Sequence, residues 1–88
     1  MSTVTSDCYG LADYIEQHGQ HIAADAEHQR QWAWELRNPT AETLVHNIEL
    51  LLWCKTEIPP HVVWAAQRLQ ALIDSHTKRE LAALLRAA

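Results

Sequence analysis

The spacing of apolar residues predicts that the chain is almost entirely helical. Between residues 7 and 37, six apolar side chains recur at steps of three, four and seven residues. On a helical wheel they fall within about 80° of one another, which indicates one face of an amphipathic helix. This stripe consists of Leu11, Ile15, Ile22, Ala26, Ala33 and Leu36. Because the stripe keeps its phase across Gly19, we expect one continuous helix over residues 7–37, although glycine is a weak helix former.

A proline ends this predicted helix. Pro39 disfavours helical geometry at Asn38, so a second helix is expected over residues 40–56, with Asn38 or Thr40 as its cap. The segment from Ile48 to Cys54 makes the last two turns of this helix apolar nearly all round. A helix of this kind is buried on several sides. It is therefore expected at the centre of the domain or in a subunit interface.

Two consecutive prolines, Pro59 and Pro60, separate this helix from a third one over residues 60–74. The segment 77–80, Thr-Lys-Arg-Glu, has the form of a capping box ahead of several leucines. It indicates a short fourth helix over residues 77–87, with an unbroken third helix as the alternative. The pattern thus predicts an all-α fold, a small helical bundle of three main helices and a short fourth.

Composition favours a single helical domain over residues 1–88. Hydrophobic residues make up 48% of the chain, which has only two Gly and three Pro and is rich in helix-forming residues. A domain of this size buries only about 60% of its unfolded surface, so we expect it to gain stability by dimerising or by binding a partner. Two cysteines, no signal-peptide pattern and no apolar run of membrane-spanning length indicate a cytoplasmic protein with no membrane partner.

The net charge of −4 is unevenly distributed. Residues 1–44 carry seven acidic and two basic residues, which gives −5, whereas residues 45–88 carry four acidic and five basic residues, which gives +1. Proteins that bind nucleic acid normally present a basic stripe, and this chain has none, so a nucleic-acid partner is disfavoured. A helix-turn-helix regulator is the weakest alternative. It would have to present Gln67, Arg68 and Gln70 to DNA bases.

Four potential metal ligands recur on the first predicted helix at steps of three, four and three residues. They are His18, His21, Asp25 and His28. On a continuous helix they lie within about 80° of one another, and imidazole with carboxylate at such spacing is typical of zinc or nickel ligands. A second element would have to complete the coordination, and a solvated polar face is the simpler interpretation. A metal-binding protein is therefore the alternative function, and no cofactor is expected.

No catalytic constellation is apparent in the sequence. Cys8 lies near the predicted start of the first helix, where the helix dipole would lower its pKa, but nothing orients a histidine toward it. Cys54 lies in an apolar run and is expected to be a core thiol. Phosphate-binding loops, metalloprotease patterns and nucleotide fingerprints are absent. The chain is therefore predicted not to be an enzyme.

The tryptophans are the stronger indication of function. The chain has four Trp and no Phe, and Trp is enriched among the residues that anchor protein interfaces. Trp32 and Trp34 border the apolar stripe on opposite sides, and Trp53 and Leu50 widen the apolar face of the second helix. The sequence thus predicts a helical protein–protein interaction module. It would act as a regulator, adaptor or inhibitor by occupying a surface of a larger protein. The sequence also predicts that the protein forms a homodimer through the second helix.

Overall fold

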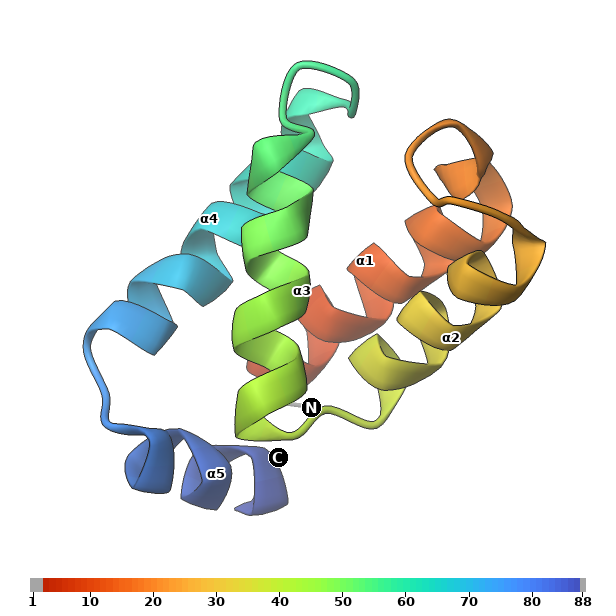
Figure 1. Cartoon of the computed structure of the whole chain (residues 1–88). Helices are drawn as coiled ribbons and strands as arrows, with labels where there is room; N and C mark the ends of the chain where they lie inside the picture. Colours follow the sequence, from red (N-terminus) through yellow and green to blue (C-terminus); the bar gives the residue numbers. More distant parts are fainter. Residues whose placement is uncertain (1–2, 88) are drawn as a thin grey trace.

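The computed structural model describes residues 3–87, and all regular structure in this part of the chain is helical (Figure 1). The elements are α1 (Thr3–His18), the short 3-10 helix η1 (Gly19–His21), α2 (Ala26–Arg37), α3 (Ala41–Trp53), α4 (Pro60–Asp74) and α5 (Lys78–Ala87). None of these helices is long and apolar enough to cross a bilayer. The all-α prediction is confirmed, with five α-helices where three or four were expected.

The predicted continuous helix over residues 7–37 is wrong, because the chain reverses direction between α1 and α2 (Figure 1). A straight helix of that length would extend for about 46 Å. The described chain measures only 33 Å along its longest axis. Folding the helix in two lets both halves of the apolar stripe contact the same core, which a straight rod of this length cannot do.

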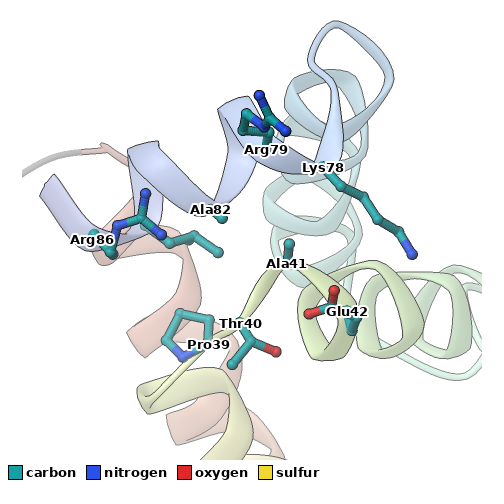
Figure 2. Close-up of a pocket in the computed structure, with 9 residues that line it drawn as sticks. Pro39, Thr40, Ala41, Glu42, Lys78, Arg79, Ala82 and Arg86 are labelled. Atoms are coloured by element: carbon teal, nitrogen blue, oxygen red, sulfur yellow. The ribbon is translucent and has the colours of Figure 1, made fainter.

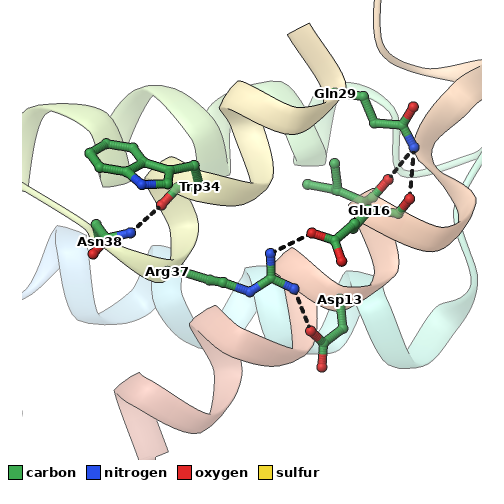
Figure 3. Close-up of polar contacts among 7 residues, drawn as sticks. Asp13, Glu16, Gln29, Trp34, Arg37 and Asn38 are labelled. Atoms are coloured by element: carbon green, nitrogen blue, oxygen red, sulfur yellow. Dashed lines mark hydrogen bonds and ion pairs between the residues drawn. The ribbon is translucent and has the colours of Figure 1, made fainter. Parts of the chain in front are cut away.

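A side chain of α2 caps the end of α1 at this reversal. The Gln29 amide Nε2 donates to the carbonyl of Ile15 at 2.7 Å and to that of Glu16 at 3.0 Å (Figure 3). These carbonyls lose their helical partners where α1 ends. Gly19 is buried at the same point, and a Cβ there would lie 3.2 Å from Ile15 Cγ2. A side chain at Gly19 would therefore crowd Ile15, whereas Gln29 Cγ, 3.7 Å from that Cβ, would be at an ordinary contact distance.

An ion-pair cluster joins the C-terminal end of α2 to the second half of α1. The Arg37 guanidinium contacts Asp13 at 2.7 Å and Glu16 at 2.8 Å (Figure 3). Arg37 lies in the last turn of α2, and both carboxylates belong to α1. Together with the Gln29 contacts, this cluster ties α2 to α1 at two points along its length.

The predicted breaks at the prolines are confirmed, and of the two alternatives at residues 77–80 the structure has the separate helix. Thr40 caps α3 in a reciprocal pair with Thr43, and Pro60 occupies the first turn of α4. The Thr77 and Glu80 side chains each accept from the other residue's backbone N–H, at 3.1 and 2.8 Å, so α5 is a separate helix. Two boundaries differ from expectation, since α1 already begins at Thr3 and α3 ends at Trp53 rather than near residue 56.

The core lies where α3 is packed between the α1–α2 hairpin, α4 and α5 (Figure 1). Its largest fully buried side chains come from all five helices, namely Leu11, Ile15, Leu36, Leu44, Ile48, Leu51, Leu69 and Leu81. The helix predicted to be central is therefore central. However, its apolar face is wider than the core needs, because Leu50 and Trp53 remain exposed.

We expect Gln29→Ala to lower the free energy of unfolding by about 1–3 kcal/mol, because it leaves buried carbonyl groups at the end of α1 without donors. Urea unfolding followed by circular dichroism would measure the loss. Gln67→Ala is the matched control, since Gln67 is exposed on α4. Equal stability of the two variants would show that the Gln29 cap does not hold the hairpin.

Candidate functional site

A groove between α2 and α3 gathers several of the residues that the sequence singled out. It encloses about 350 Å³, the size of a small ligand site or of a pocket for one or two anchoring side chains. It is lined by His28, Gln31, Trp32 and Glu35 of α2, by His46, Asn47 and Leu50 of α3, and by the connecting residues Ile22, Ala23 and Ala24. We call this surface the α2–α3 groove.

The Glu35 carboxylate is held in place inside the α2–α3 groove by two neutral donors. Asn47 Nδ2 donates to Oε1 and Gln31 Nε2 donates to Oε2, each at 3.1 Å. Asn47 is only 2% exposed, so its amide is a rigid anchor for the carboxylate. Among the described residues that line the groove there is no Lys or Arg. The basic residues of its lining are His28 and His46, so the groove presents an oriented carboxylate that has no lysine or arginine partner there.

Trp32 forms the apolar wall of the α2–α3 groove. Its side chain is only 9% exposed and packs against the core. Its indole Nε1 is buried and has no hydrogen-bond acceptor within residues 3–87. Such an unpaired donor is uncommon in a folded protein. Trp32, which the sequence placed at the border of the apolar stripe, is thus a core residue that also lines the groove.

The other residues predicted to contact a partner are exposed, but they do not share one surface. Leu50 lines the α2–α3 groove and is 39% exposed, and Trp53 follows it on the same side of α3, one turn later, at 83% exposed. Trp34 is also exposed, but it lies two residues from Trp32 and thus on the opposite side of α2. Trp32 and Leu50 are therefore the members of the predicted set that line this groove, and Trp53 lies one turn beyond it.

The predicted metal-ligand face does not form. Its residues, His18, His21, Asp25 and His28, fall on α1, on η1, before α2 and on α2. The His18 ring packs 5.6 Å from that of Tyr14, and His21 Nε2 donates to the carbonyl of Glu57 at 2.8 Å. Within residues 3–87, no three His, Cys, Asp or Glu side chains are placed to hold a metal ion. The interpretation of these residues as one helix face is wrong, because the helix ends at His18.

Two of these residues instead form the N-terminal cap of α2 beside the groove. The Asp25 carboxylate accepts from the backbone N–H of His28 at 2.8 Å and contacts its ring Nδ1 at 2.9 Å. These hydrogen bonds lower the pKa of Asp25, and the side-chain hydrogen bond and the negative charge raise the pKa of His28. The pair therefore fixes the orientation of the His28 ring at the edge of the α2–α3 groove.

The cysteine that the sequence placed near a helix start is a buried core residue. Because α1 begins at Thr3, Cys8 lies well inside the helix and is only 1% exposed. Burial, with a smaller effect from the negative charge of Asp7, raises the pKa of the Cys8 thiol to about 11. The expected lowering of this pKa is wrong, and Cys8 is held as a neutral thiol at physiological pH.

Two of the three side chains proposed for DNA contact are engaged within the molecule. The Arg68 guanidinium contacts the Asp7 carboxylate at 2.9 and 3.1 Å, and Gln70 Nε2 donates to Asp74 at 2.8 Å. Arg68 thus links α4 to α1, and Gln70 forms a hydrogen bond within α4. This arrangement offers no support for the helix-turn-helix alternative.

Comparison with known proteins gave no relative: no family model matches the chain, and neither curated proteins nor solved structures match it.

Trp32 and Trp53 are expected to differ sharply in their effect on stability. We expect Trp32→Ala to lower the free energy of unfolding by about 3–5 kcal/mol, because it opens a cavity in the core. Trp53→Ala should change it by no more than about 0.5 kcal/mol, because that indole is solvent-exposed. Denaturant unfolding of both variants tests this, and a large loss in Trp53→Ala would contradict the exposed position.

The Asp25 and His28 pair predicts a defined pH dependence. We expect Asp25→Asn to lower the pKa of His28, because it removes a charged acceptor while asparagine still caps the helix. Proton NMR titration measures this pKa, and Glu27→Gln, which removes a smaller contribution, is the control. In the wild type the pair stabilises the fold fully between about pH 4 and 6.5. Its contribution is lost as the pH rises through the raised pKa of His28 or falls through the lowered pKa of Asp25.

Proposed function

We propose that this protein is a helical interaction module that regulates or adapts a larger protein by binding one of its segments in the α2–α3 groove. The segment is an amphipathic helix with an apolar anchor and a lysine or arginine one turn away. Helices of this kind bind in grooves between helices through anchors at steps of three, four and seven residues.

The oriented Glu35 carboxylate is the observation that carries the proposal. Two side-chain amides hold both of its oxygens, and one of them, Asn47, is buried. A carboxylate positioned in this way loses little freedom when a cation binds, so most of the interaction energy is retained. A charge-assisted hydrogen bond from a guanidinium or an ammonium group is also about twice as strong as a neutral one. The groove is thus prepared for a basic residue.

The apolar surface around Glu35 supplies the anchor site. Trp32 forms the wall, and Leu50 and Trp53 are exposed along the adjoining side of α3. Exposed aromatic and aliphatic side chains at neighbouring positions mark interaction surfaces, and tryptophan is frequent among the residues that dominate binding energy. A partner that covers Leu50 and Trp53 would remove from water the part of α3 that the core leaves uncovered.

The charge of the surrounding chain favours the same partner. Residues 1–44, which include all of α1 and α2, carry a net charge of −5. Long-range attraction of this kind speeds the encounter with a basic partner and repels acidic ones. A second copy of the chain is the competing occupant, and the homodimer stays a prediction that sedimentation of the purified protein would test.

Selection of helical peptides of about 16 residues from a displayed library tests the proposal. We expect peptides selected on the wild type to combine a large apolar residue with Lys or Arg three or four positions away. Leu50→Asp should weaken their binding by about tenfold or more, because it places a charge in the anchor site. Glu35→Gln should weaken binding less and reduce its salt dependence, because it removes the charge alone.

Leu84→Asp is the matched control, since Leu84 on α5 is 37% exposed and Leu50 is 39% exposed. It lies outside the α2–α3 groove, so the selected peptides should bind it as they bind the wild type. Equal weakening by both substitutions, or selected peptides without basic residues, would contradict the proposal.

A further inference from the structure

A second groove, of about 480 Å³, lies between the start of α3 and α5. Three cations of α5, Lys78, Arg79 and Arg86, line it, together with aliphatic residues of both elements. Figure 2 shows Lys78 and Arg86 at its two ends, with Ala82 between them. We call this surface the α3–α5 groove. It shares no lining residue with the α2–α3 groove.

The cations of the α3–α5 groove have no acidic partner within residues 3–87. Two other arginines are neutralised inside the molecule, Arg37 by two carboxylates of α1 and Arg68 by Asp7. No ion pair of this kind forms at Lys78, Arg79 or Arg86 in the described chain. Of the described residues that line the groove, Glu42 is the one acid. The groove thus carries a local excess of positive charge on a protein whose net charge is −4.

The spacing of these cations indicates the kind of ligand. Lys78 and Arg86 are eight residues apart on one helix, which separates their backbones by about 12 Å. A single small anion can pair with both only if both side chains bend inward over the groove. An extended segment with two carboxylates about four residues apart covers the same distance with the side chains outstretched. The spacing therefore favours a chain of several anionic groups.

The surface between the cations favours an acidic polypeptide over a nucleic acid. Ala41, Ala82 and Leu85 line the groove and offer apolar contact to aliphatic side chains. Nucleic-acid binding draws on a broad basic footprint, because neutralised phosphates supply most of its affinity. Here three cations stand beside Glu42 in a chain of net negative charge. The groove is thus suited to carboxylates that alternate with apolar residues.

We propose that the α3–α5 groove is a second docking surface, which binds an acidic, leucine-rich segment of a partner protein. The carboxylates of the segment pair with Lys78 and Arg86 at the two ends, and its aliphatic side chains contact Ala82 and Leu85 between them. With the basic segment proposed for the α2–α3 groove, the protein would join two segments of opposite charge on separate faces. The second surface does not depend on the first.

A dye-labelled synthetic peptide of about 12 residues, with alternating pairs of glutamate and leucine, is the probe. Fluorescence anisotropy with the full chain at low salt should show saturable binding that weakens as salt is added. Lys78→Glu combined with Arg86→Glu should weaken it by about tenfold, because two attractions become repulsions. Arg30→Glu combined with Lys55→Glu is the matched control. It reverses two exposed cations outside the groove and should change the affinity by less than about twofold.

Circular dichroism would show that both double variants keep the helical content of the wild type. Leu50→Asp should leave the binding of the acidic peptide unchanged, which separates this proposal from that for the α2–α3 groove. No saturable binding, or equal weakening in both double variants, would overturn the proposal. Tighter binding of an oligothymidylate that is lost in the Lys78 and Arg86 variant would overturn it in favour of a nucleic-acid surface.

Discussion

The contact between Gln29 and the end of α1 is the constraint on which the rest of this structure depends. Its side-chain amide replaces helical donors for two carbonyls that the reversal of the chain leaves free, at 2.7 and 3.0 Å. Without such a donor, buried carbonyls would each cost about 1–3 kcal/mol, a large share of the stability of so small a domain. The reversal brings α2 back along α1, and Arg37 in the last turn of α2 forms ion pairs with two carboxylates of α1. The position of α2 then sets the groove that it forms with α3.

The α2–α3 groove is a direct consequence of this hairpin. Because α2 lies along α1, Trp32 packs in the core and Glu35 faces α3. There the buried Asn47 donates a hydrogen bond to the Glu35 carboxylate. Polar groups at such a junction are costly unless they are paired, and here the amide is paired with a carboxylate that a partner can still reach. At the other end of α3, the cations of α5 line a groove of opposite charge. The first turn of α3 thus lines the groove with the cations, and its later turns line the groove that holds Glu35.

The candidate site could be predicted only in part. Leu50 and Trp53, which the sequence singled out as partner contacts, are exposed, because the apolar face of their helix is wider than the core needs. Glu35 and Asn47 carry no signal in the sequence, since a carboxylate and an amide twelve residues apart become partners only through packing. The histidines were misleading for the opposite reason. Regular spacing implies a shared face only while the helix continues, and it ends at His18.

By itself the sequence determined the helical class, the breaks at Pro39 and at Pro59–Pro60, and the uneven charge, and it left the break at residues 75–77 as one of two alternatives. These features are local, because proline geometry, capping boxes and helix propensity act within a few residues. Only the tertiary structure decided that residues 7–37 form a hairpin and that Trp32 is buried while Trp34 is not. An apolar stripe indicates which residues are buried. It does not indicate which helix packs against them, so one long helix and a hairpin of two helices show the same sequence pattern.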